Sequence, residues 1–141
     1  IRPADLLRFG RSKIIPSMQP ILFFSDGTGT TDDYRKLIDT GAPLAFGADA
    51  PMRGFDPIEG IYAAVNAGGK RGITIEEAVQ AYTLGAAYAE FQEKEKGSIE
   101  VGKLADLVIL SEDIFAEKSK FRAVTIILTV VNGRVVYDNN K

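Results

Sequence analysis

The residue best placed for chemistry is Asp49. It follows residues 44–48, which are apolar at every position, and it precedes a proline at Pro51. Continuous apolarity without alternation is typical of a strand buried on both faces, as in a parallel sheet. Reactive groups of α/β folds gather at the carboxyl ends of such strands, and a carboxylate there can bind a metal ion or accept a proton from bound water. The structural alternative is an aspartate that caps its own turn.

Two further polar side chains could contact a substrate. Gln19 ends the mostly apolar run of residues 13–19, which predicts a strand. It would point to the same edge as Asp49 if the two strands are parallel, although a lone glutamine can equally satisfy loop backbone. Arg53, four residues after Asp49, could hold a carboxylate through two hydrogen bonds or could be a solvated loop charge. We predict Gln19 and Arg53 as substrate-binding residues.

The stretch Gly27-Thr28-Gly29 is the one other motif with functional potential. It lacks the Gly-Lys-Ser/Thr sequence of a P-loop and the third glycine of the dinucleotide fingerprint, so a plain loop is favoured. A phosphate-binding α/β domain that uses residues 25–31 remains a minor hypothesis.

Composition excludes several classes of protein. The 141 residues carry 17 Lys plus Arg and 19 Asp plus Glu, so a basic surface for nucleic acid is absent. No apolar stretch approaches the roughly 18 residues of a membrane span. The chain has no histidine and no cysteine, which excludes a self-contained zinc site and a Ser-His-Asp triad. No signal segment follows Ile1, and a cytoplasmic location is the favoured expectation.

Apolar spacing, caps and turn residues predict the elements that position these side chains. Helices precede and alternate with two strands, and a hairpin follows at the end. This order indicates an α/β fold with a parallel sheet and a separate antiparallel layer. The predicted helices are 3–9 (ended by Gly10), 34–41, 56–68 and 74–91, and the predicted strands are 13–19, 44–48, 107–110, 124–131 and 134–137.

Taken together, residues 44–51, 56–65 and 74–89 resemble the carboxyl-terminal part of the amidohydrolase superfamily, in its family 3 branch. Residues 97–110 are similar to the segment that leads into the small β-domain of that superfamily. Residues 130–137 are similar to its closing hairpin. The similarity follows the family's order over nearly the whole chain.

The resemblance implies a metal-dependent hydrolase built on a (β/α)₈ TIM barrel. Residues 1–96 would form the last two strand-helix units of the barrel. Residues 97–141 would form the carboxyl-terminal strands of a small composite β-sandwich, which is assembled from both chain ends. The implied reaction is hydrolysis of C–N bonds in small amides, ureas or cyclic amides.

The resemblance also assigns site residues. Asp49 aligns with the aspartate that ends the eighth barrel strand, binds the metal, zinc by preference, and orients or deprotonates the attacking water. The segment around Gln19 aligns with the end of the seventh strand, where substrate contacts occur. The family's histidines would precede Ile1. We therefore expect this chain alone to bind no metal and to be inactive, because a hydrolytic zinc takes three protein ligands.

The apolar side chains of the strand predicted at 44–48 must be buried by other parts of a protein. Each exposed side chain the size of leucine forfeits roughly 1.5–3 kcal/mol of burial. We expect either a missing amino-terminal barrel segment or a homo-oligomer to supply that cover. The alternative function is therefore a non-catalytic module for self-association or partner binding on the same scaffold.

Overall fold

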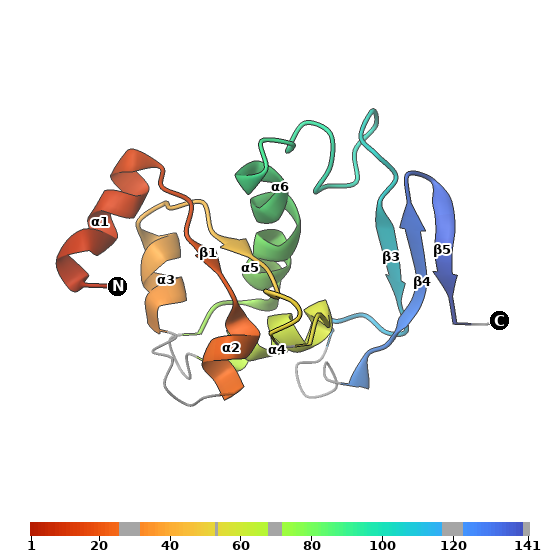
Figure 1. The fold of residues 1–141 in the computed structure, drawn as a ribbon, viewed down its shortest axis with the longest axis horizontal. Coiled ribbons are helices and arrows are strands. Elements are labelled where there is room, and N and C mark those ends of the chain that lie inside the picture. Colours follow the sequence, from red (N-terminus) through yellow and green to blue (C-terminus); the bar gives the residue numbers. More distant parts are fainter. Residues whose placement is uncertain (26–31, 53, 68–71, 117–122, 140–141) are drawn as a thin grey trace.

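The fold is described for residues 1–25, 32–52, 54–67, 72–116 and 123–139 of a computed structural model (Figure 1). One part is mostly helical and contains a two-stranded parallel sheet. The second part is a three-stranded antiparallel sheet that stands to one side, at the right of the view. The chain is therefore mixed α/β, as the sequence predicts.

The amino-terminal helix is longer than predicted. It does not end at Gly10, because Lys13 adopts the left-handed conformation (φ 49°) instead and closes the helix. Gly10 has a packing role, since a Cβ at this position would lie 1.9 Å from the carbonyl oxygen of Thr40. The elements up to the second strand are α1 (Pro3–Ser12), β1 (Ser17–Met18), α2 (Pro20–Ser25), α3 (Asp32–Asp39) and β2 (Ala45–Phe46).

The first strand is shorter than predicted, and a helix follows it that the sequence analysis does not predict. Of residues 13–19, only Ser17 and Met18 pair with β2. Pro20 then begins α2, because proline is favoured in a first helical turn, where its missing N–H costs nothing. The short α2 packs against α4 (Pro57–Ala67).

Capping residues begin the later helices where the sequence predicts. Asp56 Oδ1 accepts a hydrogen bond from the N–H of Ile58 at 2.9 Å, in the first turn of α4. Thr74 and Glu77 form the predicted capping box of α5 (Ile75–Gln80). The helix predicted over 74–91 is interrupted by a π-helical turn, η2 (Ala81–Gly85), before α6 (Ala86–Ala89).

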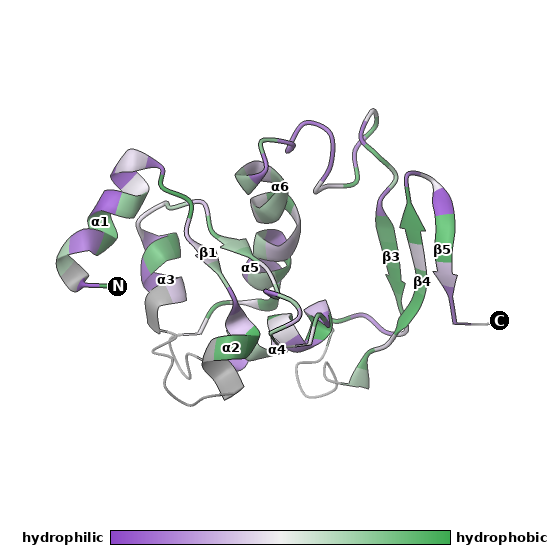
Figure 2. Ribbon diagram, viewed as in Figure 1, coloured by the Kyte–Doolittle hydropathy of each residue, from purple (hydrophilic) through white to green (hydrophobic). Residues whose placement is uncertain are grey.

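The three-stranded sheet contains β3 (Leu107–Leu110), β4 (Ile126–Val131) and β5 (Arg134–Asp138), in that order. Asn132 and Gly133 both have positive φ angles, 48° and 74°, as the predicted two-residue hairpin requires. Figure 2 shows that β3 and β4 are predominantly hydrophobic.

The core lies between β2 and helices α3, α4 and α5. Phe46 of β2 packs edge-to-face on Tyr34 and on Tyr82, with ring centroids 5.1 and 5.4 Å away. Leu44, Ala45 and Phe46 are 7%, 3% and 4% exposed. The expectation that this strand needs a cover from outside the chain is therefore wrong for these three residues, because the chain's own helices bury them.

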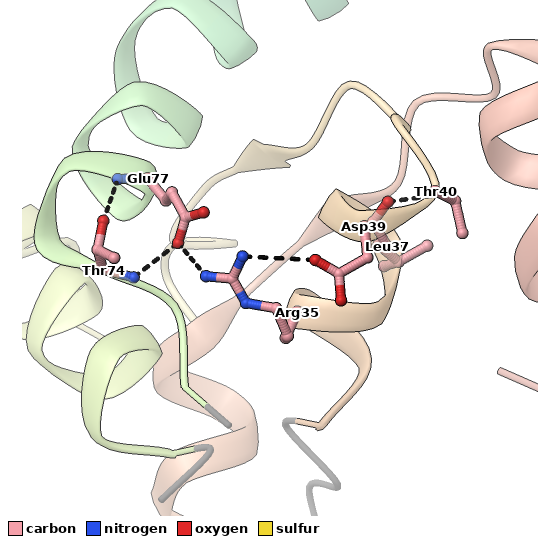
Figure 3. A network of polar contacts seen from close by, with 6 residues as sticks. All are labelled: Arg35, Leu37, Asp39, Thr40, Thr74 and Glu77. Carbon is pink, nitrogen blue, oxygen red and sulfur yellow. Dashed lines mark hydrogen bonds and ion pairs between the residues drawn. The ribbon is translucent and has the colours of Figure 1, made fainter. Parts of the chain in front are cut away.

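A polar network joins α3 to α5 (Figure 3). Glu77 Oε2 accepts the backbone N–H of Thr74 at 2.7 Å and also pairs with the guanidinium of Arg35. Asp39 Oδ1 lies 3.5 Å from the same guanidinium. The network fixes the start of α5 against α3, on the helical side of β2. Within the described ranges, no helix is long and apolar enough to cross a membrane.

Candidate functional site at the carboxyl edge of β1 and β2

The two short strands place their carboxyl ends at one edge. They are parallel, with Ser17 opposite Ala45 and Met18 opposite Phe46, and the N–H of Gly47 bonds the carbonyl of Met18 at 3.0 Å. Gln19 follows β1 directly, and Asp49 follows β2 after Gly47 and Ala48. The parallel arrangement on which the prediction for Gln19 depends is therefore confirmed, whereas the roles of both residues stay predictions.

Asp49 presents its carboxylate to solvent. Its backbone is left-handed (φ 55°), a conformation that Asp and Asn tolerate better than most side chains. The turn after it is closed by backbone, since the N–H of Met52 bonds the carbonyl of Asp49 at 3.1 Å. In the part of the chain that the structure describes, the Asp49 carboxylate has no hydrogen bond or ion pair, so it does not cap this turn.

Gln19 lies at the junction of β1 and α2. Its carbonyl accepts the N–H of Leu22 at 3.2 Å, which ties the residue to the first turn of α2. The side chain is partly buried and makes no hydrogen bond with any described residue. An amide in this position can meet a ligand at the edge without first breaking a bond.

Two of the motifs named above fall outside the described residues. Arg53, predicted as a substrate-binding residue, is one of them, and Gly27-Thr28-Gly29 is the other. Gly54 to Asp56, on the far side of Arg53, are described and are exposed. The loop between β2 and α4 is therefore defined at both of its ends.

The chain's own residues do not fit a complete metal site. Three protein ligands are usual for a catalytic zinc. Among the described residues no three His, Cys, Asp or Glu side chains gather into such a group, and the sequence has no histidine or cysteine at all. Asp49 could supply one ligand.

A cleft of about 750 Å³ opens between the end of the β2–α4 loop and the three-stranded sheet. We call it the Phe55 cleft. One wall is formed by residues 54–58, and the other by β4, β5 and the residues that flank them. The sequence analysis misses it, because the two walls are far apart along the chain and no local pattern links them.

Tyr82, next to the start of α4, has a buried hydroxyl. Burial raises the pKa of Tyr82 to about 12, and the negative charge of Asp56 acts in the same direction. The hydroxyl has no hydrogen-bond partner among the described residues. It occupies space that Gly60 leaves open, since a Cβ at Gly60 would lie 2.0 Å from it. The ring is therefore a packing element beneath the helix that follows the candidate site.

The sequence of the chain matches one protein family over nearly its whole length. The sequence profile of the Amidohydrolase family matches residues 1–137, and the chain therefore belongs to this family. This confirms the resemblance drawn from the sequence.

Known proteins are similar to this chain. Imidazolonepropionase of Kosmotoga olearia is 36% identical over 107 residues, which cover 73% of this chain and 26% of that protein. N-substituted formamide deformylase of Arthrobacter pascens is 29% identical over 113 residues, covering 74% and 21%. The crystal structure of an uncharacterized metal-dependent hydrolase from Pyrococcus horikoshii OT3 superposes with a TM-score of 0.71 and 28% identity, over 84% of this chain and 28% of that chain.

The chain spans about a quarter of the length of these curated relatives. Most of each relative's own length is therefore unmatched.

Proposed function

We propose that the complete protein is a metal-dependent amidohydrolase that cleaves C–N bonds of small amides or cyclic amides, and that Asp49 takes part in the reaction. The observation that carries this proposal is an exposed carboxylate, without a partner among the described residues, at the carboxyl edge of two parallel strands in a chain of the Amidohydrolase family. The name of one relative, N-substituted formamide deformylase, supports the bond type, because a formamide is an amide.

The proposal includes a division of the chain. Residues 1–96 would be the last two strand-helix units of a TIM barrel. Residues 97–141 would be strands of the small β-domain. The other barrel strands and the remaining metal ligands would come from residues outside this sequence, so the 141 residues alone should be inactive.

A divalent metal, zinc by preference, would supply an activated water in the complete protein. Asp49 would hold it as one ligand or accept a proton from the water. Gln19 could donate a hydrogen bond to a substrate carbonyl, and Arg53 could bind an acidic group on the substrate.

The test is turnover of N-methylformamide by the complete, metal-loaded protein and by its Asp49→Asn variant. Asparagine tolerates the left-handed backbone of position 49 (φ 55°), so this change removes the charge without straining the turn. Loss of a general base costs on the order of 10²–10⁴-fold in rate, and we expect a loss in that range.

The matched control is Glu59→Gln, which removes an exposed carboxylate from the first turn of α4. It should leave turnover near the parent value. Thermal unfolding of both variants checks that the fold is retained. If Asp49→Asn turns over as fast as Glu59→Gln, the assignment of Asp49 is wrong.

A second candidate function is self-association without catalysis, and the outer face of the three-stranded sheet favours it. The strand register places Leu107, Ile109, Leu128, Val130 and Val135 on one face. Leu107, Ile109 and Val135 are 36%, 53% and 56% exposed. This function predicts a stable oligomer of the complete protein with no amide turnover, which light scattering and the assay above would reveal together.

A further inference from the structure

The π-helical turn η2 contacts both β2 and the start of α4 through one side chain. The ring of Tyr82 packs edge-to-face on Phe46, the last residue of β2, with ring centroids 5.4 Å apart. The Tyr82 hydroxyl is buried and reaches the first turn of α4, where it fills the space that Gly60 leaves open. Tyr82 therefore contacts the two elements that the β2–α4 loop, residues 47–56, connects.

A second residue of η2 brings the same turn close to β2. A Cβ at Gly85 would lie 2.1 Å from the carbonyl oxygen of Leu44, the residue directly before β2, so the approach requires glycine at this position. π-helical turns are frequent at functional sites. Here the turn carries both Gly85 and Tyr82, and together they hold the helical segment against the strand that leads to Asp49.

Asp49 lies between the two ends of the β2–α4 loop. It follows Phe46 by three residues, which span at most roughly 10 Å of extended chain. Its own turn is closed by the hydrogen bond from the N–H of Met52. At the other end of the loop, Asp56 caps α4, and its charge acts on the Tyr82 hydroxyl. The position of Asp49 therefore depends on how these two ends are held.

From these contacts we infer that Tyr82 is a positioning residue for Asp49: it fixes both ends of the loop 47–56 and so sets where the Asp49 carboxylate lies. Its effect on the loop follows from packing alone, whereas its effect on turnover rests on the proposed function. A displacement of about 1 Å at a reacting group can cost about 10²-fold in rate. Tyr82 can therefore change the rate without contacting the substrate.

The experiment replaces Tyr82 in the complete, metal-loaded protein and measures turnover of N-methylformamide. Tyr82→Phe keeps the ring on Phe46 and should have a kcat within about twofold of the parent value. Tyr82→Leu removes the ring, and we expect kcat to fall by about tenfold to a hundredfold while KM changes by less than about threefold. The split is expected because, under the proposed function, Asp49 acts in the reaction rather than in substrate binding.

Amide hydrogen exchange over residues 47–52 measures the loop without turnover. It should be at least about threefold faster in Tyr82→Leu than in the parent, and unchanged in Tyr82→Phe. Gly60→Ala perturbs the same contact from α4, because its methyl group would lie 2.0 Å from the Tyr82 hydroxyl. It should lower kcat, and the loss should be smaller in the Tyr82→Phe background, where that hydroxyl is removed.

The matched control is Gly10→Ala, which introduces a comparable clash away from the loop. Its Cβ would lie 1.9 Å from the carbonyl oxygen of Thr40, where α1 packs beside α3. Thr40 precedes β2, whereas Asp49 follows it. The control should lower the thermal stability but keep kcat and the exchange over residues 47–52 near the parent values.

The inference is overturned if folded Tyr82→Leu keeps the parent's kcat and exchange rate over residues 47–52. It is also overturned if Gly60→Ala loses as much kcat with Tyr82→Phe as without it, or if Gly10→Ala lowers kcat as much as Gly60→Ala does. If Tyr82→Leu does not fold, the comparison of Gly60→Ala in the two backgrounds decides. If the parent hydrolyses no formamide, the proposed function fails, and the exchange over residues 47–52 alone decides this inference.

Discussion

Replacing Glu77 by alanine should lower the free energy of unfolding by about 2–3 kcal/mol. The side chain is 26% exposed and its partner Arg35 is 28% exposed, so the pair is partly shielded from water. A hydrogen bond to a charged group contributes about 1.5–3 kcal/mol, and a capping bond such as that to Thr74 contributes about 0.5–1 kcal/mol. Asp39 remains as a second partner for Arg35 when Glu77 is removed. We therefore expect a loss in the lower part of the range that these two contributions add up to.

Urea unfolding of the parent and variant proteins measures the loss. Amide hydrogen exchange adds a local measurement, because the N–H of Thr74 bonds Glu77 Oε2 and should exchange faster in Glu77→Ala. The control is Glu59→Ala, which removes an exposed carboxylate from the first turn of α4, outside the capping box. It has the same change in helix propensity and should cost less than about 0.5 kcal/mol. Equal losses in the two variants would refute the reasoning.

Two other predictions concern the same helices. Burial alone would raise the pKa of Glu77, but hydrogen bonds from Arg35 and the Thr74 backbone lower it below the usual 4.5. Its contribution is therefore present above about pH 4.5 and lost as the pH falls through the lower folded-state pKa, so the acid-side fall in the urea midpoint should be shallower in Glu77→Gln. In thermal unfolding, Tyr82→Phe should be neutral or slightly stabilising, because the buried hydroxyl has no hydrogen-bond partner among the described residues. Gly60→Ala should cost about 1–3 kcal/mol through overpacking, and less in the Tyr82→Phe background.

Local chemistry in the sequence predicts the element ends where one residue decides the outcome. Asp56, Thr74 and the Asn132-Gly133 pair act on backbone groups within a few residues, and each does so where predicted. The paired strand ends Met18 and Phe46 follow from the apolar runs before them, although only two residues of each run pair. The antiparallel layer is also predictable, from apolar runs that are bounded by turn residues.

Tertiary contacts decide the features that the sequence does not predict. The π-helical turn Ala81–Gly85 lies where the chain approaches β2 closely, since a Cβ at Gly85 would lie 2.1 Å from the carbonyl oxygen of Leu44. Helix α2 is too short for a periodic pattern, and packing on α4 accounts for it. At the site, the strand-end position of Asp49 is predictable from the sequence, but the Phe55 cleft depends on residues far apart in the sequence.

Under the proposed function, this chain positions Asp49 but does not provide all of the metal ligands. On the helical side, Phe46 is held by Tyr34 and Tyr82, and the chain completes this packing by itself. The edge that carries Asp49 is therefore positioned by residues within the 141. The metal ligands are not complete within these residues, because one carboxylate cannot complete a metal site. Under the proposed function, substitutions in the core should move Asp49 and change kcat, whereas metal affinity should depend mainly on ligands contributed from outside this sequence.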